Sequence, residues 1–206
     1  MTSVYQPTYE GLQKKLAGHD LDELVERSGT RRLDAGRIGV RCVGRDYVIS
    51  HPGGVVLDAD GAPAEVSVAI LLLLYLLEST GRDMADRWVS FEQLPGGAGY
   101  SSSFRGRVMG PVLRTFGPNP EALAQAAATL DGELLEMGDV AVRLPALPRV
   151  PIAYVLWRGD DEFAPSASVV FDASVEGYLD AEVVAVLAEL ATRRLIDNAS
   201  PVRNKE

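Results

Sequence analysis

The chain has 206 residues, of which 47% are hydrophobic and 24% charged, and its formal net charge is -9 at pH 7. This length and apolar content predict one globular domain with a sizeable core. The acidic balance argues against binding to nucleic-acid backbones, which requires clustered Lys and Arg. Cys42 is the only cysteine, which excludes an internal disulfide and a four-thiolate metal site within one chain.

The first residues are polar and proline-marked, so we expect no secretion signal. The longest apolar run, residues 66–77, is about a dozen residues and too short to cross a bilayer. Together with the single cysteine, these features predict a cytoplasmic protein without membrane contact.

Residues 1–35 show helical periodicity in two short amphipathic stretches, which predicts an N-terminal helical segment. From residue 37 the period changes, and short alternating runs to Leu57 predict a meander of strands. Its last turn contains His51, Gly53 and Gly54. Residues 67–77 are apolar nearly all round, which predicts a buried central helix.

Residues 87–91 are expected to form a strand or extended segment, and the glycine-rich residues 94–103 a mobile loop. The alternative for this loop is an anion cradle, although neither nucleotide-binding glycine motif is present. Residues 104–116 predict a helix kinked at Gly110-Pro111, with arginines along it.

Four further elements are expected in the second half of the chain: a helix over 121–130, a hairpin with a two-residue turn at Gly138-Asp139, buried strands over 152–157 and 169–171, and a helix over 180–196. Residues 36–200 therefore predict a single α+β domain. We expect a mostly antiparallel sheet with one buried central helix and peripheral helices. Residues 201–206 are expected to be a frayed tail.

The loop between the two buried strands carries three consecutive carboxylates, Asp160, Asp161 and Glu162, and Asp172 follows the second strand. With His51 these residues are candidate metal ligands, because carboxylates bind hard divalent cations and mixed His/carboxylate sets bind zinc or iron. Adjacent acids cannot all face one point, so a solvated turn is the alternative interpretation. Neither Cys42 nor the serine run has the context of a nucleophile, and whether the protein is an enzyme stays open.

Several separated motifs share one order: DY at 46–47, HPGG at 51–54, WVSF at 88–91 with LPGG at 94–97, FG at 116–117, and LWRGDDEF at 156–163 with FD at 171–172. In this order they resemble the bacterial and archaeal family labelled domain of unknown function 3786, from about Asp46 to the final helix. The family supplies no established activity. Some members look like fusions to a cysteine-rich iron–sulfur segment of the sort found with corrinoid proteins of anaerobes, and this chain departs from them in having one cysteine.

The resemblance implies a ligand-binding domain in anaerobic redox or tetrapyrrole metabolism. A haem or corrinoid would use His51 as an axial ligand, with Trp88, Tyr100 and Trp157 as ring contacts. The complete set of residues expected to bind a small-molecule or cofactor ligand is His51, Gly53, Gly54, Trp88, Gly96, Gly97, Tyr100, Arg105 and Trp157.

Two alternatives come from other functional classes. One is a non-catalytic interaction module whose acidic face docks a basic protein partner. The other is a metal-dependent hydrolase or transferase that uses Asp160, Asp161 and Glu162.

Overall fold

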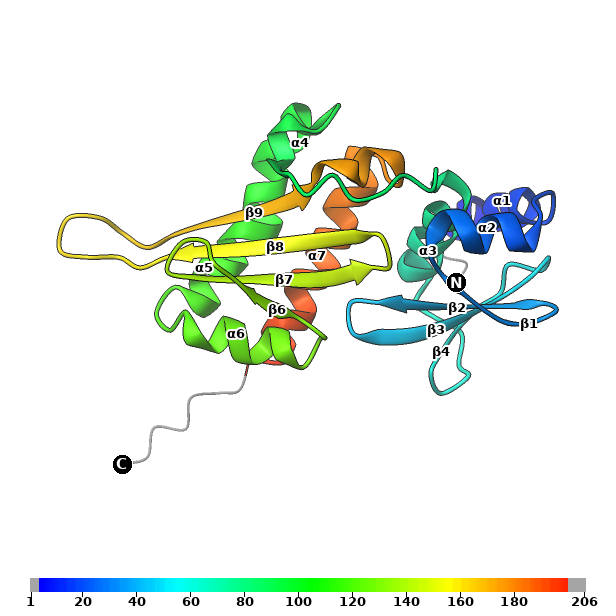
Figure 1. The fold of residues 1–206 in the computed structure, drawn as a ribbon, viewed down its shortest axis with the longest axis horizontal. Helices are drawn as coiled ribbons and strands as arrows, with labels where there is room; N and C mark the ends of the chain where they lie inside the picture. Colours follow the sequence, from blue (N-terminus) through cyan, green and yellow to red (C-terminus); the bar gives the residue numbers. More distant parts are fainter. Residues whose placement is uncertain (1–3, 200–206) are drawn as a thin grey trace.

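The computed structural model describes residues 4–199, so the expected tail at 201–206 lies outside the described residues. The chain forms two halves, each built on an antiparallel sheet covered by helices (Figure 1). The α+β class is therefore confirmed, but the single expected sheet is two sheets. Among residues 4–199, no helix combines the length and apolar character needed to cross a membrane.

The first half contains the N-terminal helices and the strand meander. Its elements are α1 (Gln6–Leu16), α2 (Leu21–Ser28), β1 (Arg31–Asp34), β2 (Arg37–Cys42), β3 (Arg45–Ser50), β4 (Val56–Asp58) and α3 (Val66–Glu78). The strands follow one another in the order β1-β2-β3-β4. The two amphipathic helices, the meander and the central helix are confirmed, whereas β1 was not expected from the sequence.

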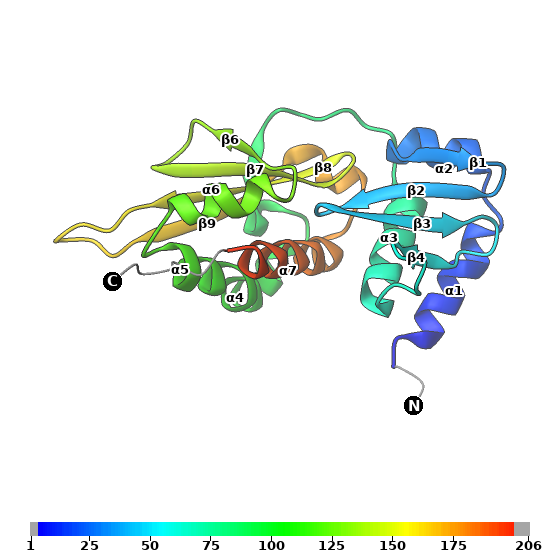
Figure 2. The same ribbon diagram turned by 90° about the horizontal axis from the view of Figure 1, so that it is seen from below.

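The second half contains the remaining strands and the helices that cover them. Its elements are β5 (Trp88–Ser90), η1 (Phe91–Gln93), α4 (Gly97–Phe104), the π-helical η2 (Arg105–Met109), α5 (Gly110–Phe116), α6 (Glu121–Ala128), β6 (Glu133–Leu135), β7 (Val140–Leu147), β8 (Val150–Trp157), β9 (Ser166–Asp172), η3 (Ala173–Gly177) and α7 (Ala181–Asp197). The sheet order is β5-β9-β8-β7-β6. Helices α4, α5 and α7 lie along one face of this sheet (Figure 2).

Two local predictions were wrong. The glycine-rich stretch is not a loop from Gly97 onward but the helix α4, and a Cβ on Gly97 would clash with the Phe91 carbonyl oxygen. This glycine therefore permits close packing rather than mobility. The β6–β7 connection is also longer than two residues, because Leu135 pairs with Ala141.

The core of the second half forms between its sheet and its helices. Strand β8 is buried along nearly its whole length, as its unbroken apolar run predicts. Tyr154 of this strand hydrogen-bonds to Thr192 of α7 at 3.0 Å. Phe104 of α4 stacks on Phe91 with ring centroids 4.2 Å apart and meets Phe171 of β9 edge-on. These contacts fix α4 and α7 against the sheet.

The two halves are joined by the segment 79–87, which crosses between them (Figure 2), and by a buried arginine. Arg194 of α7 is 3% exposed. Its guanidinium donates to the carbonyl oxygens of Cys42, the last residue of β2, and of Val43 in the turn that follows, and to the Tyr47 hydroxyl at 2.6 Å. We call this set the Arg194 clasp.

Replacing Arg194 with Met should lower the free energy of unfolding by roughly 3–5 kcal/mol, because the two carbonyls and the hydroxyl lose a buried charged donor. The matched control is Arg193→Met. Arg193 is the exposed neighbour that pairs with Glu65 at 3.5 Å, and its loss should cost about 1 kcal/mol or less. Urea unfolding of both variants measures the difference, and equal losses would contradict the role of the clasp.

Candidate functional site

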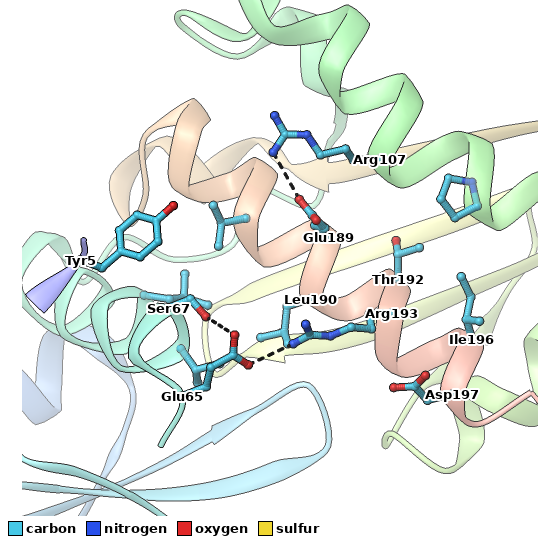
Figure 3. A pocket seen from close by; sticks show the side chains of 14 residues that line it. Tyr5, Glu65, Ser67, Arg107, Glu189, Leu190, Thr192, Arg193, Ile196 and Asp197 are labelled. Carbon is cyan, nitrogen blue, oxygen red and sulfur yellow. Dashed lines mark hydrogen bonds and ion pairs between the residues drawn. The ribbon is translucent and has the colours of Figure 1, made fainter. Parts of the chain in front are cut away.

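A groove lies between the two halves and is formed by two adjoining cavities of about 510 and 560 Å³. Helix α3 supplies one wall of the first cavity and α7 another (Figure 3). Helix α4 and η2 complete the second cavity. The cavities share Tyr5, Ser67, Arg107, Val186 and Glu189. Volumes of this size match those of ligand sites in proteins.

The second cavity is lined largely by apolar side chains of α3 and α7. Ile70 and Leu74 come from α3, and Val183 and Val186 from α7. Three of the large hydrophobic residues that remain exposed on the described chain line it: Tyr5 at 60%, Tyr100 at 49% and Val186 at 41%. An apolar surface of this kind is typical of a binding site.

Ion pairs border this apolar surface. Arg107 of η2 lies 3.5 Å from Glu189 of α7, and Arg193 lies 3.5 Å from Glu65 across the groove. The Ser67 hydroxyl donates to Glu65 at 2.9 Å, as Figure 3 shows. The charged side chains of both pairs are exposed, so water weakens the pairs and a ligand can exchange with them.

The π-helical turn at residues 105–109 places Arg107 beside the groove. The Gly110 N–H donates to the Arg105 carbonyl, five residues earlier. Pro111 has no N–H, and its ring crowds the carbonyl four residues before it, so a regular α-helix cannot continue here. The kink expected at Gly110-Pro111 is therefore accommodated as a π turn, a feature that recurs at functional sites.

Most of the residues predicted to bind a ligand lie away from this groove. Imidazole Nε2 of His51 lies 2.8 Å from the His19 carbonyl oxygen, at the end of the first sheet. The carbonyl of Gly54 accepts from Tyr9 at 3.0 Å and from Gln13 at 3.2 Å. The turn at 51–54 thus docks on α1.

The three predicted aromatic contacts do not surround one point. Trp88 lies opposite Asp172 and Trp157 opposite Ser166 along β9, so six residues of extended strand, about 20 Å, separate them. Both lie on the face of the sheet away from α4. Tyr100, on α4, is the one predicted aromatic that lines the groove.

The remaining predicted positions shape α4. Gly96 has a left-handed φ of 81° just before this helix, and Gly97 donates its N–H to the Leu94 carbonyl at 2.8 Å. Arg105 reaches back to the Ser101 carbonyl at 3.4 Å on the same helix. The Gly97 N–H is thus already occupied, which weakens the anion-cradle alternative.

The acidic loop lies at the end of the β8–β9 hairpin, which projects beyond the sheet (Figure 1). Asp160 accepts hydrogen bonds from the N–H groups of Glu162 and Phe163 at 2.9 and 2.7 Å, and these bonds hold the pKa of Asp160 below its ordinary value. Asp160 therefore shapes the turn. Metal binding at Asp161 and Glu162 stays a prediction.

Asp172 has a structural setting in the second half. It is 4% exposed and accepts from the N–H groups of Ala85 at 2.8 Å, Arg87 at 3.3 Å and Ser174 at 2.9 Å. Burial raises the pKa of Asp172, but the hydrogen bonds from Ser174, Ala85 and Arg87 together lower it below its ordinary value of 3.8. Within residues 4–199, no group of three or more His, Cys, Asp or Glu side chains is placed to hold a metal ion.

Cys42 is fully buried in β2. Burial raises the pKa of its thiol to about 12, and the nearby Arg194 charge offsets only part of this rise. The thiolate fraction at neutral pH is therefore negligible, so the folded protein does not present Cys42 as a nucleophile.

Val186 and Arg107 line the groove but were not among the ligand-binding residues predicted from the sequence. Apolar side chains recur in α7 at Val183, Val186 and Leu190, beside the buried row that contains Val184 and Leu187. The apolar face of α7 is wider than packing against one sheet requires, and this width was the signal in the sequence for a second contact surface.

Asp172→Ala should lower the free energy of unfolding at pH 7 by roughly 2–4 kcal/mol, because buried N–H groups lose their acceptor. Asp161→Ala, on the exposed turn, should change the free energy of unfolding by about 0.5 kcal/mol or less.

The lowered pKa of Asp172 also predicts a pH dependence. The ionised carboxylate stabilises the fold at pH values above its unfolded-state pKa, and this contribution is lost as the pH falls through the lower folded-state pKa. The difference between wild type and Asp172→Asn should therefore shrink below about pH 4. A difference that grows in acid contradicts this assignment.

Thiol labelling tests the state of Cys42. Iodoacetamide at pH 8 should leave the folded protein unmodified and should label one thiol per chain after addition of guanidinium chloride. Stoichiometric labelling of the folded protein would show that the thiol is accessible.

Comparisons with known proteins give a family but no function. No curated protein matches the chain, and no solved structure matches it. The model of DUF3786, a domain of unknown function, matches residues 20–194. The chain therefore belongs to the DUF3786 family, as its motif order predicted.

Proposed function

We propose that this chain is a ligand-binding domain and that its ligand occupies the groove between the two halves. The observation that carries the proposal is the pair of adjoining cavities, which share Tyr5, Ser67, Arg107, Val186 and Glu189. Apolar side chains beside polar and charged groups suit a ligand with an apolar body.

A neutral apolar dye tests this proposal without favouring a charge. Nile red should bind with a fluorescence increase, and Val186→Trp should weaken binding by roughly tenfold or more, because the indole fills the space shared by both cavities. Position 186 is 41% exposed, so the larger side chain does not enter the core.

Leu134→Trp is the matched control, since Leu134 is 73% exposed on β6 and lines neither cavity. Its affinity for the dye should equal that of wild type. Equal affinities for all three proteins would place the dye elsewhere and refute the groove as the site.

The tetrapyrrole expectation has a separate test within this proposal. Haem or a corrinoid bound through His51 should give an absorbance change that His51→Ala abolishes and Val186→Trp leaves intact. Binding in the groove predicts the opposite pattern for these two variants. No absorbance change with either compound would remove tetrapyrroles from the ligands of this domain.

A further inference from the structure

We infer that the groove binds a basic amphipathic helix of a protein partner, an inference that rests on the groove being the binding site. A third cavity, of about 540 Å³, extends the groove and shares Leu74, Asp180 and Val183 with the second. The lining thus follows α7 from its N-cap Asp180 to Asp197. A helix of that length measures about 25 Å.

Acidic side chains outnumber basic ones along the groove. No arginine or lysine lines the third cavity, but Glu78, Glu176 and Asp180 do, and Glu182 lies in the second. The groove's two arginines, Arg107 and Arg193, are already opposite acidic residues. Among the described residues, none of the ion pairs includes Glu78, Glu176 or Glu182.

These acids border apolar side chains. Leu74, Leu94 and Val183 line the same cavity as Glu78 and Glu176. A partner that fits must therefore place apolar groups against these side chains and positive charges beside the acids. This combination describes an amphipathic basic segment.

Because the walls of the groove are helices, they favour a helical partner over an extended peptide. Helices α3, α4 and α7 form the walls, and their N–H and C=O groups are largely used within the helices. No strand of the described chain lines the three cavities, so a bound peptide cannot complete a sheet. A helix suits such walls because its backbone groups bond within the helix itself.

The side-chain spacing also fits a helix. Ile70 and Leu74 recur at four residues on α3, and Val183 and Val186 at three on α7. Rows with these spacings form the ridges and grooves into which apolar side chains at i, i+3, i+4 and i+7 of a third helix pack.

Fluorescence anisotropy with labelled synthetic helices tests the inference. The probe is an amphipathic Leu/Lys peptide of about 14 residues, compared with its Leu/Glu counterpart and with a scrambled Leu/Lys peptide that has no apolar face. We expect binding of the first peptide alone, with affinity that falls as salt is raised.

Two double variants separate the groove from general attraction to an acidic protein. Glu78→Gln with Glu182→Gln should weaken binding of the Leu/Lys peptide by roughly fivefold, whereas Glu26→Gln with Glu136→Gln removes the same charge at exposed positions outside the groove and should weaken it by less than about twofold. Equal losses in both, or equal binding of the scrambled peptide, would overturn the inference.

Nile red distinguishes the failure of this inference from the failure of the groove itself. The neutral dye should bind the Glu78→Gln, Glu182→Gln protein as it binds wild type, which also shows that the groove is intact. Dye binding that depends on Val186, together with no binding of the Leu/Lys peptide, overturns the helical partner and leaves the proposed function standing. Dye binding that does not depend on Val186 refutes the proposed function.

Discussion

The groove depends on the buried guanidinium of Arg194. Its charge lies in the interior at 3% exposure and is met by two carbonyl oxygens and the Tyr47 hydroxyl, with no carboxylate among these partners. A buried ion that is hydrogen-bonded to backbone carbonyls tolerates little displacement. Each lost hydrogen bond leaves a buried polar group without a partner, which lowers the stability of the fold. Arg194 belongs to the last turns of α7, which is a wall of the groove, so the clasp ties that wall to the half of the chain that contains α3.

The turn that the clasp holds is itself strained. Val43 has a φ of 42°, a left-handed value that β-branched residues rarely adopt, and Gly44 follows at 72°. Strain of this kind costs about 1–3 kcal/mol. It is offset because Val43 is buried to 1% exposure, its N–H donates to the Ala146 carbonyl at 2.9 Å, and its own carbonyl accepts from Arg194. The contacts that dock the first half on the second thus stabilise an otherwise unfavourable backbone conformation in this turn.

Local patterns predicted most elements, and non-local packing explains the errors. The apolar run of residues 152–157 predicts a buried strand, and the structure confirms it as part of β8. That same run does not reveal which strands pair, so two sheets were predicted as one. Gly97 was interpreted as part of a mobile loop because the approach of the Phe91 carbonyl is invisible in the sequence. The groove was missed for the same reason, since Val186 and Arg107 are ordinary surface residues until the fold brings together these two positions, which are 79 residues apart in the chain.

The carboxylates of this acidic chain have different structural roles. Asp160 shapes a turn, Asp172 ties the connecting segment to the second sheet, and Glu121 pairs with Arg158. Glu78 and Glu182 do none of these things in the described structure, yet both border exposed apolar surface. A solvated acid far from apolar surface needs no more explanation than solubility. An acid beside an unfilled apolar groove raises the charge of the one surface where a partner gains most from burial, which is why the groove, and not the more conspicuous acidic hairpin, carries the functional proposal.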